Sequence, residues 1–385
     1  MKLVPSRTDS ELALAVRSWA ASLDPRIAPA EEAGTLPLDV VRELGDLGVL
    51  GMTVPEADGG LGASAVAFAL VLEELAHRWP SLALGVSVNS GIVAGSIVRY
   101  GTREQRARWL PTLMDGRGLG AFALTEPASG SDAASLRATA VRDGDGWRIS
   151  GQKQFITSAR YAPLFIVLAR DSAAEPADAR PQAGVTAFIV PADAAGVRVG
   201  AAEAKTGLLA SDTSALVLDD VRVAADAVLG EVGKGFAIAM AGLDGGRIGI
   251  AAQSVGIARA AVDRAVAYGR GRAQFGRSIL EFEMPRFSLA TARTEIDAAR
   301  LLTHRAAWLR DLGRPFTREA SIAKLYASEV AQRATYAAVQ VFGGYGYMRE
   351  YGVERYARDA RATTIYEGTS EVQRLVIARS LLGAA

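Results

Sequence analysis

The spacing of apolar residues changes twice along this chain of 385 residues and divides it into three regions. In residues 10–100 apolar side chains recur every three or four positions, as at Val40 and Leu44, and this period predicts helices. In residues 120–225 short β-rich runs alternate with turns. After Gly235 long helical patterns resume and continue to the end. The chain is therefore expected to be mainly α-helical with a β middle part.

The middle region contains signals for several short strands. The runs 136–141 and 147–150 flank the sequence Asp-Gly-Asp-Gly at 143–146, which is typical of a β-hairpin turn. Several short strands in so small a region predict an antiparallel sandwich or barrel. The segment 171–184, rich in Ala, Pro and Asp, is predicted to be a surface loop. Further strands are expected at 164–169, 184–190 and 215–223.

Charge and composition exclude several classes of protein. Lysine and arginine (43) nearly balance aspartate and glutamate (42), so no overall field draws the chain to nucleic acid or to an anionic membrane. The absence of cysteine excludes disulfides, thiolate nucleophiles and zinc–cysteine sites. The two histidines, His77 and His304, lie far apart in the sequence. We therefore expect ordinary helix residues there, rather than metal ligands or members of a catalytic triad.

The N-terminal segment bears on location. Lys2 and Arg7 are followed closely by Asp9 and Glu11, and the apolar core of a signal peptide is missing. We also expect no uninterrupted apolar span that could cross a bilayer. A cytoplasmic protein without membrane partners is the resulting prediction.

Three glycine clusters invite comparison with nucleotide-binding loops. They lie at 59–62, 230–235 and 343–346, and none has the spacing of a Rossmann fingerprint or of a P-loop. Turns between helices account for the first two. Gly343 and Gly344 differ because they follow a helical pattern that contains Gln340, so their backbone could approach a cofactor closely.

A glycine pair interrupts the longest helical pattern. Gly245 and Gly246 lie within residues 236–266, where each interior glycine costs about 1 kcal/mol relative to alanine. The pair is therefore expected to make room for another group. Asp244 and Arg247 flank it at a spacing of three, which places a carboxylate and a guanidinium on one helix face. A solvated ion pair beside a helix-packing notch is the alternative.

One carboxylate stands just ahead of the last helical pattern. Ser370 and Gln373 have the spacing of a capping box, so Glu367 is expected just outside a helix N-terminus. Gly368 gives a large group access to the backbone, and Thr369 with the free amides of the first turn suits a phosphate. The sequence thus indicates a base beside a phosphate-bearing cofactor. A second capping box, formed by Thr364 and Glu367 with no catalytic role, remains open as the alternative.

Five spaced motifs over nearly the whole chain resemble the acyl-CoA dehydrogenase family. They are Leu-Thr-Glu-Pro-Ala-Ser-Gly-Ser-Asp at 124–132, Gly-Gln-Lys-Gln-Phe-Ile-Thr at 151–157, Arg-Ala-Gln-Phe-Gly at 272–276, Gln340 with Gly343 and Gly344, and Tyr-Glu-Gly-Thr at 366–369. The resemblance implies an N-terminal helical domain, a small antiparallel β-barrel or sandwich, and a C-terminal four-helix bundle. We place these domains at 1–119, 120–228 and 229–385.

The resemblance also implies the chemistry. An FAD-dependent enzyme of this family forms a trans-2-enoyl thioester from an acyl thioester, with flavin N5 as the hydride acceptor and no metal. Glu367 matches the base that removes the α-proton, and its backbone N–H is expected to hold the thioester oxygen. Substrate contacts are implied for Ser131, Asp244, Arg247 and Gly368. FAD contacts are implied for Phe122, Leu124, Thr125, Ser131, Phe155, Ile156, Thr157, Arg272, Phe275, Gln340, Gly343, Gly344, Thr369 and Glu371.

Further expectations concern partners. In the family, the positions matching Arg272 and Gln340 reach the flavin of a neighbouring subunit, so the resemblance implies a homotetramer. Electron-transfer flavoprotein is the expected electron acceptor. Glu283 and Pro285 depart from the family pattern, because a carboxylate near FAD phosphates would be unfavourable. The alternatives are an acyl-carrier-protein substrate, a catalytically silent family member, and a flavin oxidase or monooxygenase on the same fold.

Two residues bear on the identity of the base. Some relatives carry the base on the long helix, at the position that Gly246 occupies here, and lack it at the later site. With glycine at 246 and glutamate at 367, the resemblance implies a single base, Glu367. Glu126 is the other nearby carboxylate, and it is expected in a flavin-binding turn rather than as a base.

Overall fold

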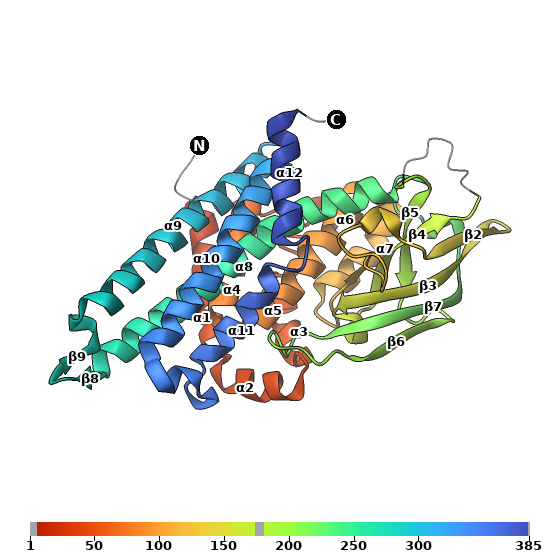
Figure 1. The fold of residues 1–385 in the computed structure, drawn as a ribbon. Coiled ribbons are helices and arrows are strands. Elements are labelled where there is room, and N and C mark those ends of the chain that lie inside the picture. Colours follow the sequence, from red (N-terminus) through yellow and green to blue (C-terminus); the bar gives the residue numbers. More distant parts are fainter. Residues whose placement is uncertain (1–5, 174–180, 384–385) are drawn as a thin grey trace.

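A computed structural model describes residues 6–173 and 181–383 (Figure 1). Residues 174–180 of the predicted loop 171–184 lie outside the described residues. Helices precede the sheet, as the apolar period predicts, and His77 and His304 both lie in helices. The first helices are α1 (Arg7–Ala21), α2 (Asp24–Ala33), α3 (Leu38–Asp46), α4 (Ala65–Arg78), α5 (Pro80–Val86), α6 (Gly95–Tyr100) and α7 (Arg103–Met114).

A π-helix joins α5 to α6. This segment, η2 (Ser87–Ala94), makes Pro80–Tyr100 one continuous helical stretch that is apolar and long enough to span a membrane. The expectation that no such stretch exists was therefore wrong. In the most apolar 18-residue window of this stretch, 89% is buried within the protein, so these side chains contact protein atoms.

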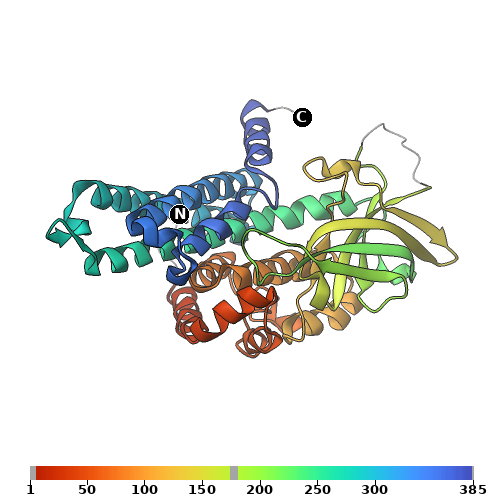
Figure 2. The same ribbon diagram turned by 60° about the horizontal axis from the view of Figure 1, so that its bottom comes forward.

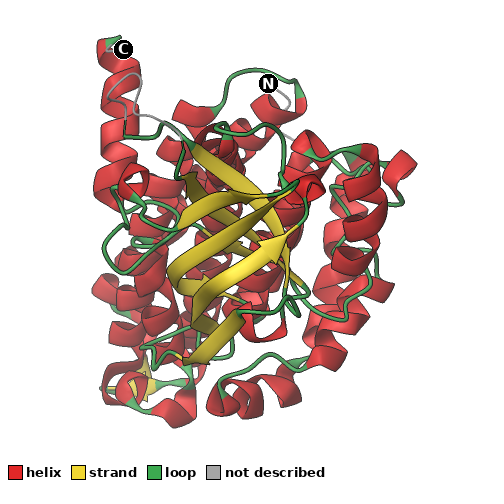
Figure 3. Ribbon diagram, turned by 90° about the vertical axis from the view of Figure 1, so that its right-hand side faces the viewer, coloured by secondary structure: helices red, strands yellow, loops and turns green. Residues whose placement is uncertain are grey.

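The middle region folds into one twisted sheet, seen face-on in Figure 3. Among the described residues seven strands join in the order β1-β4-β2-β3-β7-β6, with β5 paired to β4. The predicted hairpin is confirmed, because Asp143 pairs with Gly146 across a two-residue turn. The strands are β1 (Ala121–Ala123), β2 (Thr139–Asp143), β3 (Gly146–Thr157), β4 (Leu164–Asp171), β5 (Val185–Pro191), β6 (Val197–Ala202) and β7 (Thr213–Val223).

The sheet is mixed rather than purely antiparallel. Four strand pairs are antiparallel, as predicted, but β1 and β2 both run parallel to β4. Parallel strands need a crossover connection, and here the chain passes through β3 between β2 and β4, and through β2 and β3 between β1 and β4. Such pairing leaves no local sequence signal.

The C-terminal half consists of long helices packed side by side (Figures 1 and 2). Helix α8 (Gly235–Gly271) contains the predicted helical pattern and packs against α10, α9 and α4. A short hairpin of β8 (Ala273–Gln274) and β9 (Arg277–Ser278) follows it, and the end of α12 projects from the helical body. The other helices are α9 (Glu283–Asp311), α10 (Thr317–Phe342), α11 (Val353–Thr363) and α12 (Ser370–Leu382).

A shared apolar core fixes the sheet against the helices. One buried cluster combines residues of α5, η2 and α7 with residues of β4, β5 and α8, such as Val88, Ile166 and Ile250. Phe122 and Tyr366 pack at its edge, although 244 positions separate them in the chain. The sheet and the turn before α12 therefore meet through this core.

Candidate active site

The turn between α11 and α12 carries the predicted base in an uncommon backbone conformation. Glu367 has φ +53° and Gly368 has φ +92°, so two consecutive residues are left-handed. Helix α12 begins at Ser370, but its N-cap is Thr369, whose side-chain oxygen accepts from the Val372 N–H at 3.3 Å. The predicted capping box of Ser370 and Gln373 was therefore wrong by one residue.

The alternative capping box is also excluded. The hydroxyl of Thr364 donates to the carbonyl of Arg361 at 3.1 Å, and both carboxylate oxygens of Glu367 are buried with no hydrogen-bond partner among the described residues. Burial raises the pKa of Glu367 to about 7, against smaller lowering effects of the charges on Lys324 and Arg247. An unpaired buried carboxyl of this kind can act as a proton acceptor near neutral pH.

The predicted space beside the glycine pair holds this carboxylate. A Cβ atom on Gly246 would lie 2.1 Å from Glu367 Oε2, and a Cβ atom on Gly245 would lie 3.1 Å from the Arg310 guanidinium. Any side chain at 246 would therefore displace the carboxylate. The glycine in α8 and the glutamate after α11 form one site, although 121 positions separate them in the chain.

Two side chains donate hydrogen bonds to the backbone carbonyls of the Glu367–Gly368 turn. Lys324 Nζ of α10 donates to the Gly368 carbonyl at 2.7 Å, and Gln373 Nε2 of α12 donates to the same oxygen at 2.9 Å. Gln373 also reaches the Glu367 carbonyl at 3.3 Å. No described residue accepts a hydrogen bond from the Glu367 N–H. That N–H is therefore available to a ligand.

The flanking ion pair is largely buried, so the solvated-pair alternative is excluded. Arg247 Nη1 lies 2.7 Å from Asp244 Oδ1, and the Arg247 side chain is 6% exposed. Burial raises the pKa of Asp244, although Thr317 Oγ1 donates to its other oxygen. Burial lowers the pKa of Arg247, which also makes a long hydrogen bond of 3.4 Å to Ser321. The ion pair with Asp244 and the hydrogen bond to Ser321 hold the Arg247 guanidinium where its positive charge acts on Glu367.

The residues predicted to hold the flavin ring come together on the sheet. The Gln154 N–H donates to the Thr125 carbonyl at 2.9 Å and joins the segment after β1 to β3. Phe155 has φ +57° and is 63% exposed, whereas Ile156 is buried. Thr157 ends β3 opposite Thr213 of β7. An exposed aromatic ring beside these polar groups can receive a flat ligand.

The remaining predicted residues of this region differ in exposure. Leu124 is buried and Phe122 half-buried in the core that Tyr366 also joins, while Ser131 is exposed in the loop after β1. Glu371 is exposed in the first turn of α12. Glu126 accepts from Arg137 N, Ala138 N and Lys153 Nζ, and the Lys153 charge with these hydrogen bonds lowers its pKa despite burial. Glu126 is thus a structural anchor.

The residues predicted to hold the nucleotide lie elsewhere on the same chain. Arg272, Gly343 and Gly344 line an open pocket of about 480 Å³, and no atom lies within 4 Å of a Cβ built on either glycine. Gln340 is exposed in the last turns of α10, and Phe275 is 94% exposed in the β8–β9 turn. Glu283 is exposed as the first residue of α9.

This second group is remote from the base within one chain. Twenty-six residues of helix separate Gly246 from Arg272, which corresponds to roughly 39 Å at 1.5 Å per residue. An extended FAD is shorter than this distance. One FAD molecule therefore cannot contact both groups of a single chain.

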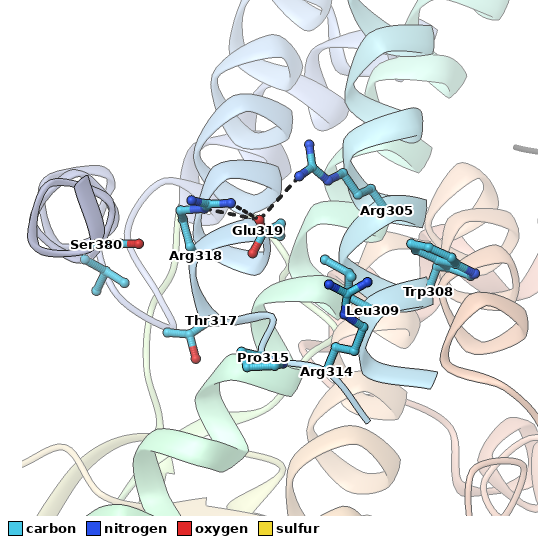
Figure 4. Close-up of a pocket in the computed structure, with 10 residues that line it drawn as sticks. Arg305, Trp308, Leu309, Arg314, Pro315, Thr317, Arg318, Glu319 and Ser380 are labelled. Carbon is cyan, nitrogen blue, oxygen red and sulfur yellow. Dashed lines mark hydrogen bonds and ion pairs between the residues drawn. The ribbon is translucent and has the colours of Figure 1, made fainter. Parts of the chain in front are cut away.

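A larger basic pocket opens beside Thr317 (Figure 4). Its volume is about 770 Å³, and it lies between the end of α9, the start of α10 and α12. Arg305 and Arg318 both pair with Glu319, whereas Arg314 forms no ion pair within the ranges that the structure describes. The lining residues are Arg305, Trp308, Leu309, Arg314, Pro315, Thr317, Arg318, Glu319, Val376 and Ser380.

The residues present fit an FAD cofactor. The sheet offers the exposed ring of Phe155, and the core shared by Leu124 and Tyr366 joins it to the turn of Glu367, whose buried carboxyl has no hydrogen-bond partner among the described residues. The far pocket offers a guanidinium and two unobstructed glycines, which suit a pyrophosphate. When bound, FAD would supply a hydride acceptor.

Sequence reasoning missed several members of the site. Lys324, Gln373, Thr317 and Ser321 contact the base turn or the ion pair. Apart from Gln373, which was assigned to the cap, they lie on one helix that reads as an ordinary amphipathic pattern. The spacing 317, 321 and 324, three to four residues apart, places these polar groups on one face of α10 and was the available signal.

Comparison with family models covers almost the whole chain. Residues 6–117 match "Acyl-CoA dehydrogenase, N-terminal domain", residues 121–221 match the middle domain, and residues 233–382 match the C-terminal domain. The three matches follow one another in the order predicted from the motifs.

Known proteins show the same relationship. The chain is 43% identical to the mitochondrial short-chain specific acyl-CoA dehydrogenase of Bos taurus over 94% of this chain and 86% of that protein. It matches the solved butyryl-CoA dehydrogenase of Megasphaera elsdenii with a TM-score of 0.95 and 40% identity, over 99% of this chain and 100% of the other. A chain from the structure of the electron transferring flavoprotein of Acidaminococcus fermentans gives a TM-score of 0.96 at 38% identity, over 99% and 100%. With all three domains matched at this identity, the chain belongs to the acyl-CoA dehydrogenase family.

Proposed function

We propose that this FAD-dependent acyl-CoA dehydrogenase acts on short acyl-CoA substrates at the site around Glu367. One observation carries the assignment of the site. The Glu367 carboxylate is buried without a described partner, lies against Gly246, and has a pKa raised to about 7. A carboxyl in this state is poised to accept a proton from carbon.

The residues divide the chemistry between them. Glu367 removes the proton from the α-carbon of the acyl group, and FAD, when bound, would supply the acceptor for the hydride that leaves the β-carbon. The backbone N–H of Glu367, which no described residue occupies, donates to the thioester oxygen and stabilises its developing negative charge. The product is a trans-2-enoyl thioester, and the proton remains on Glu367.

The basic pocket supports CoA as the carrier. A chain of contacts links it to the base, since Thr317 donates to Asp244, Asp244 pairs with Arg247, and Arg247 lies close to Glu367. Arg314, which forms no ion pair with the described residues, offers its guanidinium for the phosphates of CoA. The carrier-protein and silent-member alternatives are not favoured, because the relatives are acyl-CoA dehydrogenases at about this length.

The preference for short acyl groups rests on two kinds of support. The relatives described above are a short-chain specific enzyme and a butyryl-CoA dehydrogenase. In addition, Ile92 of the π-helix lies 3.0 Å from a Cβ position on Gly246, so a branched side chain narrows the space beside the base.

The proposal also covers the electron acceptor, the oligomeric state and the cellular location. Electron-transfer flavoprotein is the proposed acceptor, supported by the similarity to a chain from an electron transferring flavoprotein structure. An oligomer of at least two subunits is supported by the separation of the two FAD-binding groups, because a second subunit would complete each site, and the family resemblance favours a homotetramer. A cytoplasmic location stays a prediction that cell fractionation would test.

Anaerobic mixing of the purified holoenzyme with acyl-CoAs of about four to sixteen carbons tests the function. Butyryl-CoA and its near neighbours should bleach the flavin absorbance fastest. The Glu367→Gln variant should keep its yellow flavin and lose bleaching by about 10²–10⁴-fold. Fast bleaching by the variant would reject Glu367 as the base, and bleaching only by long chains would reject the short-chain assignment.

The carrier is tested separately. Arg314→Ala should raise KM for butyryl-CoA several-fold and leave KM for butyryl-pantetheine unchanged, because pantetheine lacks the nucleotide phosphates. Arg305→Ala, whose guanidinium is already engaged by Glu319, should have a smaller effect. Equal effects of Arg314→Ala on both substrates would contradict a phosphate contact.

A further inference from the structure

We infer that Lys324 is a positioning residue for the base, fixing the Glu367–Gly368 turn and supplying a positive charge that favours the ionised Glu367 carboxylate. The inference rests on the proposed role of Glu367. Lys324 lies on α10, and its side chain contacts the backbone of the turn.

The first argument is burial. The Lys324 side chain is fully buried, and its ammonium donates to the Gly368 carbonyl at 2.7 Å. No carboxylate lies within ion-pair distance of it in the described part of the chain. A lysine has three donors, and a buried ammonium with a single neutral acceptor is costly. An apolar side chain could fill the space at lower cost, so the charge itself needs a reason.

The second argument is redundancy in holding the turn. Gln373 already donates to the Gly368 carbonyl at 2.9 Å and to the Glu367 carbonyl at 3.3 Å. A neutral amide therefore anchors the same two peptide groups. The hydrogen bond from Lys324 adds rigidity, and what it alone adds is positive charge. The positive charge is therefore the property of Lys324 that Gln373 cannot replace.

The third argument comes from the charges around Glu367. Lys324 from α10 has the largest opposing effect on the pKa that burial raises, followed by Arg247 from α8. Arg247 is shared with Asp244, while Tyr366 beside the base stays protonated because burial raises its pKa further. Lys324 is thus the main source of stabilisation for the ionised base.

Burial and three neighbouring charged side chains determine the pKa of Lys324. Burial and then the Arg247 charge lower the pKa of Lys324 to about 8, against the effects of Glu367 and of the exposed Glu371 in α12. Between pH of about 7 and 8 the base is ionised and the ammonium is still charged. The positioning role therefore predicts fastest flavin reduction in this interval.

Three substitutions separate charge from hydrogen bonding. Lys324→Gln keeps a donor and removes the charge, Lys324→Arg keeps the charge, and Gln373→Met removes the neutral donor without changing charge. The rate constant for anaerobic flavin reduction of the holoenzyme by butyryl-CoA is measured from about pH 5.5 to 9, a range that includes the pKa values of Glu367 and Lys324.

Loss of the charge should move the acid limb of the profile. For Lys324→Gln we expect the limb about one pH unit higher and a rate at pH 7 about fivefold lower. Lys324→Arg should return the limb to the wild-type position. Gln373→Met should lower the rate equally at all pH values. A Lys324→Gln profile that is lower but unshifted would overturn the inference and leave Lys324 a structural residue.

A second measurement does not need turnover. At pH 8 the stabilising effect of Glu367→Gln on chemical unfolding should be larger in the Lys324→Gln background than in the wild type, since Lys324 no longer offsets the buried charge. Equal effects in both backgrounds would overturn the inference. If no acyl-CoA reduces the wild type, the proposed function fails while this cycle still tests the pairing of Lys324 with Glu367.

Discussion

Half of the non-glycine residues with a strained backbone are predicted site residues. Outside glycine, six described residues have positive φ, and three of them, Phe155, Phe275 and Glu367, were predicted as site residues from the sequence. Such conformations cost roughly 1–3 kcal/mol and persist where the surrounding structure holds them. At Glu367 the holding groups are Lys324 and Gln373. The strain directs the carboxylate toward Gly246 and leaves the Glu367 N–H open.

Gly246→Ala tests this contact directly. A methyl group would meet Glu367 Oε2 at 2.1 Å, so we expect a loss of about 1–3 kcal/mol in stability and a large fall in the rate of flavin reduction. Gly271→Ala, at the exposed end of the same helix with no atom within 4 Å, serves as the control. A Gly246→Ala enzyme with wild-type rate would mean that the carboxylate is not confined there.

The buried carboxylate also predicts how stability depends on pH. The pKa of Glu367 is about 7 in the fold against an ordinary value of 4.5, so the folded state binds the proton more tightly than the unfolded state. Stability contributed by this group is therefore present below about pH 4.5 and lost as pH rises to about 7.

Glu367→Gln should escape this loss. At pH 8 the variant should be more stable than the wild type by up to about 3 kcal/mol, and near pH 4 the two should agree. Urea unfolding at the two pH values measures the difference. A difference that does not change with pH would show that the carboxyl titrates normally.

Some of these residues could be predicted from the sequence alone. The glycine pair indicated a need for space, and the placement of Glu367 indicated a base. Lys324 gave no comparable signal, because a lysine in an amphipathic helix usually faces solvent. Its burial depends on how α10 packs against the turn before α12, and that packing is a property of the folded chain.

At the scale of elements, one buried ion pair ties the segment after β1 to β3. Lys153 is fully buried and lies 2.8 Å from Glu126, whose side chain is 5% exposed. Glu126 also accepts two backbone N–H groups. The pair thus fixes the strand that presents Phe155 and Thr157 relative to Thr125.

Lys153→Met should be strongly destabilising. It leaves Glu126 buried without its cation, and we expect a loss of about 3–5 kcal/mol in the free energy of unfolding together with weaker flavin retention. The double variant Glu126→Gln/Lys153→Met should recover part of the loss. Unfolding that is unchanged in Lys153→Met would contradict the anchoring role.

Elements differed in how well the sequence predicted them. The β2–β3 hairpin was predicted because its turn residues determine both pairing and register. Strand β1, only three residues long, and its parallel pairing with β4 depend on distant segments and were not. The stretch Pro80–Tyr100 was misjudged because a fully buried helix and a membrane span have the same composition.

At the scale of the whole molecule, Arg272 should couple cofactor binding to assembly. Arg272→Ala should lose FAD on gel filtration and shift to smaller species at the same time, since its pocket is proposed to serve the flavin of a neighbouring subunit. Arg198→Ala removes an exposed arginine of β6 and should change neither. Full flavin content and unchanged size in Arg272→Ala would remove the intersubunit argument.

The roughly 39 Å between Gly246 and Arg272 has a genetic consequence. If each site takes its base from one chain and its nucleotide contact from another, two inactive chains can complement each other. Co-expressing Glu367→Gln with Arg272→Ala should restore acyl-CoA-dependent flavin reduction in mixed oligomers, because some sites then combine an intact Glu367 with an intact Arg272. Variants that affect opposite ends of α8 should accordingly rescue each other in pairs, whereas variants at the same end should not.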